Sequence, residues 1–338
     1  MSGCTTILLL ALLVVQFPSS YCSDWWSIVK ERDHVFNQED ITSPISQNCS
    51  DPALFNGTLN TCQLNICRRD TKLLSTIAIG ILRALNQCQK LFKNRPWNCS
   101  VFDSGPYLGK FVIRGTHETA FLNAIISAGI AREVARNCKE HKLESCACDL
   151  SEPSTPSPGI VSIPHCGDNS NYGIKIAKEF TECVDNDGCI GQAASHNSEV
   201  GRKLVSSTTV ECSCFGICAL KTCHKKVPEI EEIGIKLLAQ YDAAKQIKEN
   251  QLIDSSNLVY CNSSPNFCKR NLTEGIYGPS GRQCWPNRVG PSSCWEMCCG
   301  GPVEQRMATE IDTSQCYFEW SIKKIKCATK TVTRQYCK

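Results

Sequence analysis

Cysteine content is the feature that most constrains how this chain folds. The sequence holds 26 cysteines among 338 residues, spread from Cys4 to Cys337. A reducing cytosol keeps thiols free, so this density indicates an oxidising compartment and a framework of disulfide bonds. Such bonds stabilise a fold largely by restricting the unfolded chain. We therefore expect cysteine pairs to hold segments that a hydrophobic core alone would leave loose.

The N-terminus has the pattern of a secretory signal peptide. The apolar run ILLLALLVV (7–15) is too short to span a bilayer, and the small-residue segment PSSYCS follows it. Removal of residues 1–22 takes Cys4 and Cys22 with it, and the even number left can pair completely. No later apolar run reaches membrane-spanning length, so we expect a secreted, extracellular protein without a stable membrane anchor. Candidate glycosylation sequons begin at Asn48, Asn56, Asn98, Asn262 and Asn271.

Apolar residues recur at helical spacing in the middle of the chain, which predicts a packed helical core. The ranges are 68–94, 116–138, about 169–184 and 191–206. Asn169 is a reasonable N-cap for the third of these helices.

Two further stretches mark connections. Residues 150–164 are rich in Pro and Ser and predict a loop, which Cys148 and Cys166 bracket. Pro228 stands where a first-turn proline is tolerated, at the start of a helix without cysteines that ends in the polar sequence QLIDSSN. We place a domain boundary after that helix.

The expected fold is α+β and disulfide-rich, with a helical N-terminal domain and a small β-rich, cysteine-rich C-terminal domain. We divide the chain into a signal peptide (1–22), a variable N-terminal segment (23–66), the helical domain (67–226), a helical linker (227–260) and the cysteine-rich domain (261–338).

The sequence offers little for catalysis or for metal binding. The cluster Cys212, Cys214, Cys218 and Cys223 beside His224 could hold zinc, but disulfides are the stronger reading in a secreted chain. The acids Asp149, Glu152 and Asp168 flank a loop and are expected to be solvated, while His117 and His196 are expected to be caps or core contacts.

No nucleophile, zinc-protease or phosphate-loop motif is present, and a net charge of +3 gives no field for nucleic acid. We therefore expect no catalytic residue, no metal and no cofactor. A protein of this kind acts through its surface, as a ligand or an inhibitor.

Short motifs occur in a fixed order over residues 67–338, and in that order they resemble the Wnt family of secreted signalling ligands. Two of them, ECSC and LKTC, lie within residues 211–223. The other motifs are RPWNC (95–99), HETAFLNAIISAGI (117–130), CACD (146–149), HCGDNSNYG (165–173), SHNSEVGRKLV (195–205), SPNFC (264–268), GPSGRQC (278–284) and CCGG (298–301).

The resemblance implies that a thumb hairpin (211–223) projects from the helical domain and an index-finger hairpin from the cysteine-rich domain. In the family these hairpins grip the cysteine-rich domain of Frizzled receptors. The implied disulfides are Cys88–Cys99, Cys138–Cys146, Cys148–Cys166, Cys212–Cys223, Cys214–Cys218, Cys268–Cys299, Cys284–Cys294, Cys298–Cys337 and Cys316–Cys327.

Six cysteines remain after this assignment. Cys183 and Cys189 are close enough in sequence to pair locally. Cys49, Cys62, Cys67 and Cys261 have no assigned partners.

The thumb tip departs from the family pattern. A typical tip is longer and carries a serine bearing a palmitoleoyl chain, whereas CFGIC has no serine or threonine between Cys214 and Cys218. We therefore expect no lipidation; Ser213 lies outside the inner ring. Lipid-free thumbs of this sort resemble the divergent insect WntD branch, which is associated with feedback inhibition of Toll/Dorsal signalling.

The finger departs too, because WSIKKIKC (320–327) replaces the usual vicinal cysteines and at least two finger disulfides are lost. Its basic run is expected to be a solvated face. Expected receptor contacts are Phe215, Gly216 and Ile217 in the thumb and Trp320, Ser321, Ile322 and Lys323 in the finger.

We carry three functional hypotheses. The first is an unlipidated ligand of a Frizzled-class receptor in developmental signalling. The second is an antagonist that occupies a receptor or a co-receptor without activating it, with residues 228–250 as a possible co-receptor surface. The third, a secreted enzyme, has no supporting motif.

Overall fold

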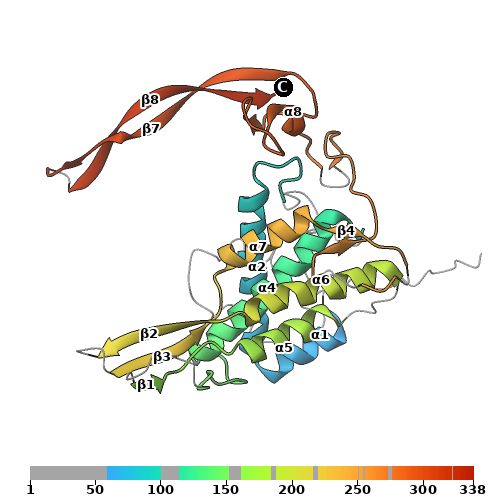
Figure 1. Ribbon diagram of the computed structural model, residues 1–338, viewed down its shortest axis with the longest axis vertical. Helices are drawn as coiled ribbons and strands as arrows, with labels where there is room; N and C mark the ends of the chain where they lie inside the picture. Colours follow the sequence, from blue (N-terminus) through green and yellow to red (C-terminus); the bar gives the residue numbers. More distant parts are fainter. Residues whose placement is uncertain are drawn as a thin grey trace, which may run out of the picture.

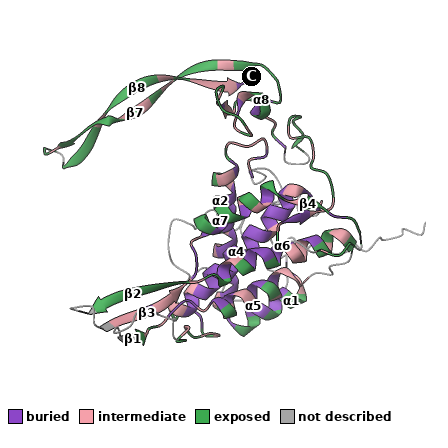
Figure 2. Cartoon of the chain, viewed as in Figure 1, coloured by how far each residue is buried: buried purple, intermediate pink, exposed green. Residues whose placement is uncertain are grey.

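The computed structural model describes residues 59–99, 114–151, 161–183, 188–215, 220–249, 251–253, 256–272, 276–321 and 323–338. The expected signal peptide, most of the variable segment, Cys49, and the sequons at Asn48 and Asn56 lie outside these residues. Figure 1 shows a helical bundle and a small C-terminal part, each of which projects one β-hairpin, and Figure 2 shows that the buried residues concentrate in the helices.

Among the described residues, six helices build the bundle, and α4 runs through its centre. They are α1 (Thr61–Arg69), α2 (Thr71–Phe92), α4 (His117–Lys139), α5 (Ser170–Thr181), α6 (Gly188–Ser206) and α7 (Ile230–Asp242). Most side chains of α4 are buried, because α2, α5, α6 and α7 all pack against it. A Cβ added to Gly129 of α4 would lie 2.4 Å from the carbonyl oxygen of Gly80 in α2, so this crossing requires glycine.

The helix ends follow the capping signals in the sequence. The Asn169 side chain accepts a hydrogen bond from the Tyr172 amide, which confirms the expected cap of α5. At α2 the cap is Asp70, whose carboxylate also accepts hydrogen bonds from the amides of Glu144 and Ser145 at 2.8 and 3.0 Å. Asp70 thereby ties the loop after α4 to the start of α2. No described helix is both long enough and apolar enough to cross a membrane.

Helical structure differs from the expectation at two places. The first is α1, which starts at Thr61 and contributes Leu64 and Ile66 to the main core. The second is the linker, which is helical only over Ile230–Asp242 and then forms β4 (Lys245–Gln246), paired with β5 (Val259–Tyr260). Glu229 is the N-cap of α7, so Pro228 precedes the helix. The apolar stripe of α7 ends at Tyr241, one residue before the end of the helix.

The end of the predicted loop 150–164 is a strand. β1 (Val161–Pro164) pairs in parallel with β3 (Leu220–Lys226), and β3 pairs with β2 (Thr209–Phe215) on its other side. The β-branched residues Val161 and Ile163 favour this extended conformation, and Pro164 is tolerated because β1 is an edge strand.

The C-terminal part is small and β-rich, as expected. It contains β6 (Gln283–Cys284), the short helix α8 (Cys294–Met297), β7 (Val303–Glu319) and β8 (Lys324–Cys337), with strand order β6-β8-β7. Its buried cluster consists of Cys284, Met297, Cys298 and Cys337. Because that cluster is small, disulfides supply much of the local constraint.

Disulfide bonds among the described residues coincide with the implied pairs at eight places: Cys88–Cys99, Cys138–Cys146, Cys148–Cys166, Cys212–Cys223, Cys268–Cys299, Cys284–Cys294, Cys298–Cys337 and Cys316–Cys327. Cys214 and Cys67 are disulfide-bonded as well. Cys218, the implied partner of Cys214, lies outside the described residues.

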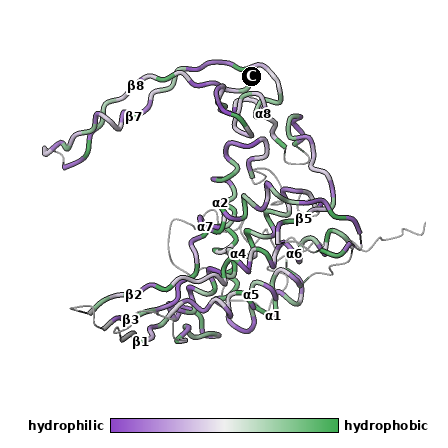
Figure 3. The backbone as a smooth tube through the Cα atoms, viewed as in Figure 1, coloured by the Kyte–Doolittle hydropathy of each residue, from purple (hydrophilic) through white to green (hydrophobic). Residues whose placement is uncertain are grey.

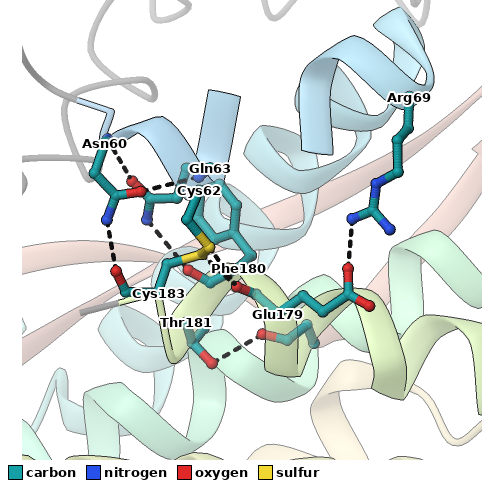
Figure 4. The surroundings of a disulfide bond; sticks show 9 residues. Asn60, Cys62, Gln63, Arg69, Glu179, Phe180, Thr181 and Cys183 are labelled. Atoms are coloured by element: carbon teal, nitrogen blue, oxygen red, sulfur yellow. Dashed lines mark hydrogen bonds and ion pairs between the residues drawn. A yellow bond between two sulfur atoms is a disulfide. The ribbon is translucent and has the colours of Figure 1, made fainter. Parts of the chain in front are cut away.

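The local pair Cys183–Cys189 was the wrong expectation. Cys183 bonds Cys62, and Cys189 bonds Cys261. The reason is that α1 packs along the end of α5, where the Asn60 side chain donates a hydrogen bond to the Cys183 carbonyl at 2.8 Å (Figure 4). This contact places Cys62 beside Cys183. Cys189 and Cys261 both pack against the buried cluster of Ala193, Ile247 and Val259, which brings the two cysteines together.

Candidate functional site

The thumb consists of β2 and β3, which continue the bundle as an antiparallel hairpin (Figure 1). Cys212 and Cys223 face each other directly in the register, with Cα atoms 4.1 Å apart, and their disulfide cross-links the strands. Closely paired positions of this kind suit a short cross-strand bond. The disulfide therefore braces the thumb along its length.

Buried polar contacts anchor the base of the thumb to the helices. Asp168 was expected to be solvated but is only 3% exposed, because its carboxylate accepts a hydrogen bond from the Val227 amide at 2.9 Å and its amide donates to the Lys225 carbonyl at 2.9 Å. A Cβ on Gly167 would come within 2.8 Å of the Lys225 backbone, so the chain passes β3 closely. The thumb and the start of α5 thus form one connected unit.

Charged groups surround the thumb base. Lys226 donates to Glu211 at 2.7 Å, and this hydrogen bond holds the pKa of Glu211 below its ordinary value. His224 lies beside Glu211 and near His165, and partial burial together with Lys139 lowers the pKa of His224. The imidazole of His224 is thus expected to be neutral at physiological pH.

The thumb tip lies partly outside the described residues. Gly216, Ile217 and Cys218 are not described, and for Phe215 only its place at the end of β2 is. Ser213 is described, exposed, and paired with Thr222 in the register. The expected thumb contacts therefore stay predictions.

The finger consists of β7 and β8, a long two-stranded ribbon whose strands are largely exposed (Figure 2). Its register shifts between Asp312 and Cys316, which marks a β-bulge. Cys316 and Cys327 face each other with Cα atoms 4.0 Å apart, and their disulfide closes the outer part of the ribbon. The bulge and the disulfide together fix the register of the tip.

Aromatic side chains are exposed at the finger tip. The Trp320 side chain is 82% exposed and meets Phe318 edge-on, with ring centroids 4.8 Å apart. Lys323 completes the turn with a positive φ of 50°, and Ser321 is exposed. Ile322 lies outside the described residues. Trp320, Ser321 and Lys323 are thus accessible, as a contact surface requires.

Arg282 joins the base of the finger to the end of α2, and the sequence analysis did not anticipate this role. Its guanidinium donates to the carbonyls of Pro96 at 2.6 Å, Lys93 at 3.0 Å and Arg95. Burial lowers the pKa of Arg282 to about 10, which leaves the side chain charged at neutral pH. The positive group sits at the carbonyl end of the helix, where the helix dipole favours it. The motif GPSGRQC contained this arginine, but sequence alone did not reveal which carbonyls it would meet.

The remaining candidate residues have structural partners. Asp149 pairs with Lys225, while His117 stacks on Tyr241 and His196 contacts the Asn257 carbonyl. Glu152 lies outside the described residues.

Two clusters of His and Cys side chains in the described part of the chain are close enough to be considered as metal sites. They lie at the disulfides Cys148–Cys166 and Cys298–Cys337. Their sulfurs are disulfide-bonded and are therefore poor metal ligands. Asn262 and Asn271 are exposed, as glycosylation requires, and Asn98 is half-buried.

Comparison with known proteins gives concordant matches. A sequence profile of the wnt family matches residues 56–338. Human Wnt-5b is 29% identical over 343 residues, which covers 94% of each chain. Wnt-5a of Xenopus laevis is 30% identical (96% and 93% covered), and Wnt-1 of Danio rerio is 31% identical (92% and 90%). A chain of the solved structure titled "Human WLS in complex with WNT8A" superposes with a TM-score of 0.60 and 28% identity, covering 79% of this chain and 95% of that one.

Proposed function

We propose, since the chain belongs to the Wnt family of signalling ligands, that it is secreted and grips the cysteine-rich domain of a Frizzled-class receptor between thumb and finger. The observation that carries this proposal is the pair of hairpins, which project to the same side of the helical bundle (Figure 1). Each has a disulfide between directly opposed residues, Cys212–Cys223 and Cys316–Cys327. Two braced projections separated by a gap are suited to holding a folded domain.

We further propose that the ligand carries no acyl chain on its thumb. The sequence between Cys214 and Cys218 is Phe-Gly-Ile and supplies no hydroxyl group. A long acyl chain contributes about 0.8 kcal/mol for each buried CH₂, so its loss removes several kcal/mol of receptor binding. Phe215 and Ile217 replace only part of this, at about 1.5–3 kcal/mol each if fully buried. The remaining affinity must come from other protein contacts.

Binding to a panel of Frizzled cysteine-rich domains tests the ligand proposal directly. We expect at least one domain to bind the secreted protein, and Trp320→Ala to weaken that binding more than Leu252→Ala, which removes another highly exposed side chain far along the sequence from both hairpins. Absence of binding to every domain would refute the proposal.

Intact-mass measurement of the peptide spanning Glu211 to Cys223 tests the lipid proposal separately. We expect the mass of the unmodified, disulfide-linked peptide. An added mass equal to a fatty acyl group would refute it.

An antagonist is the second candidate, because a single disulfide, Cys316–Cys327, joins the two strands of the finger among its described residues and the thumb tip lacks a hydroxyl. A ligand of this kind would occupy a receptor or co-receptor without activating it. Reporter cells exposed to an activating Wnt distinguish the two: an agonist adds to the signal, whereas an antagonist lowers it. Activity in development, including feedback on Toll/Dorsal signalling, is the biological setting that the lipid-free thumb supports.

A further inference from the structure

The finger has two chemically different faces, which its strand register defines. Directly paired residues share a face of a ribbon, and the faces alternate along each strand. One face comprises every second residue of β8 from Ile325 to Cys337, together with their partners on β7 from Phe318 to Val303. None of these fourteen residues, all of them described, is charged. We call this the charge-free face.

The opposite face carries the ionic groups. It comprises every second residue of β8 from Lys324 to Tyr336 with their partners on β7, and nine of these fourteen residues are Lys, Arg, Asp or Glu. Many of these charges pair within the ribbon: Lys326 with Glu319 at 3.2 Å, Lys330 with Asp312 at 3.8 Å, and Arg334 with Glu310. This face is therefore solvated and largely neutralised by its own ion pairs.

The charge-free face is mostly exposed, and it carries large apolar side chains among Thr and Gln residues. Met307, Ile311 and Ile325 are 83%, 65% and 72% exposed, and Phe318, which lies on the same face, contacts Trp320 at the turn. Figure 3 shows hydrophobic and hydrophilic residues alternating along the finger. Strand propensity does not explain the asymmetry, since it acts on both faces of the same exposed ribbon. An exposed face that carries several large apolar side chains and no charge marks a surface that another molecule covers.

We propose that the charge-free face is a docking surface for an uncharged face of the receptor domain that the thumb and finger grip. This inference rests on the proposed function and assigns the finger's contribution to Ile311, Phe318, Ile325 and Thr329 in addition to the residues of the turn. The inference also places the lysines of β8 on the charged face, which stays in contact with solvent. The partner surface must be uncharged, because a charge buried against this face would find no group to pair with.

A second copy of the chain and a lipid surface fit this face less well. A ribbon of 14 residues is about 46 Å long and about 10 Å wide, so two copies would bury roughly 900 Å² in total. Stable dimers need about 1,200–2,000 Å², and the twist of the ribbon reduces the area that can meet. A receptor domain that the thumb also contacts would bury additional interface area at the thumb, beyond what the finger alone can bury. An anionic membrane would bind the lysines of β8, but these lysines lie on the charged face and not on the charge-free face.

Neighbouring residues of β8 provide a matched test. Thr329 lies on the charge-free face opposite Ile311, and Ala328 lies on the charged face opposite Asp312; both are exposed. Thr329→Lys and Ala328→Lys each add one positive charge at almost the same height of the finger. Phe318→Lys and Tyr317→Lys form a second pair nearer the tip. Secretion yield and circular dichroism verify that all four variants fold.

Affinity for a Frizzled cysteine-rich domain that binds the wild-type protein is the measurement. We expect Thr329→Lys and Phe318→Lys to weaken binding about ten-fold or more, and their partners to stay within about two-fold. The inference would be overturned if the two variants of each pair lost affinity equally. It would also be overturned if raised ionic strength alone strongly weakened binding of the wild type. Either result would leave the proposed function intact. Self-association of the wild type that Thr329→Lys abolishes would assign the face to a second copy and also overturn it. If no domain binds the wild type, the proposed function fails first and the inference with it.

Discussion

The contact of Arg282 with the end of α2 determines how firmly the finger is held to the helical bundle. The Arg282 backbone pairs with Cys337 at the end of β8, while its guanidinium donates to three carbonyls beyond α2. A hydrogen bond to a charged group contributes about 1.5–3 kcal/mol. Water can reach some of these carbonyls after truncation, so we expect Arg282→Met to weaken the joint by about 2–4 kcal/mol in total. Arg282→Lys keeps a charge but not the forked geometry, and its effect should be intermediate.

Hydrogen–deuterium exchange provides the readout for this joint. In Arg282→Met we expect faster exchange in residues 93–97 and 281–285, with the centre of α4 unchanged, because the loss is local. Arg288→Met is the control, since this arginine is exposed and its guanidinium stacks over Trp285 at 5.1 Å in the same region. Wild-type exchange rates in Arg282→Met, or equal changes in the control, would refute the argument that this one side chain couples the two parts.

Three further perturbations test the bundle. Gly129→Ala should destabilise the fold by about 1–3 kcal/mol, measured by chemical denaturation, because its Cβ would meet the Gly80 carbonyl at 2.4 Å. Burial and a nearby carboxylate raise the pKa of Tyr241, so stability is fully present below about pH 10 and lost as the pH rises further; Tyr241→Phe should remove this alkaline loss in thermal melts. Replacing both Cys62 and Cys183 by serine should cost up to about 5 kcal/mol, since this bond closes a loop of 121 residues, and unchanged melting would contradict that.

The bundle was predictable from sequence because its signals are local. Apolar periodicity predicted α2, α4, α5, α6 and α7 but not α1, and Asn169 caps α5 with the residue type that capping requires. The pairing of Cys62 and Cys183 was not predictable, because it depends on the packing of α1 against α5. Sequence proximity favoured Cys189 as the partner, whereas the tertiary contact decided the outcome.

The charge-free face was hidden in the sequence for a different reason. Uncharged residues occupy odd positions of β7 up to Ile311, and even positions from Cys316 onward. The bulge between Asp312 and Cys316 changes the phase of the alternation, so a search for a single period of two misses the continuity. The parts of β7 before and after the bulge both pair with odd-numbered residues of β8, and this pairing shows that their uncharged residues lie on one face.

The acyl chain whose absence we propose and the charge-free face bear on the same binding free energy. Complete burial of a large apolar side chain contributes about 1.5–3 kcal/mol, and Ile311, Phe318, Ile325 and Trp320 are 65%, 44%, 72% and 82% exposed before binding. Scaled by these fractions, the four side chains offer roughly 5 kcal/mol, similar to the several kcal/mol that a buried acyl chain supplies. Part of this gain is lost in ordering a two-stranded ribbon that is only marginally rigid alone. The attachment at Arg282 therefore matters for recognition, because a finger held firmly before binding loses less conformational entropy when it closes on its partner.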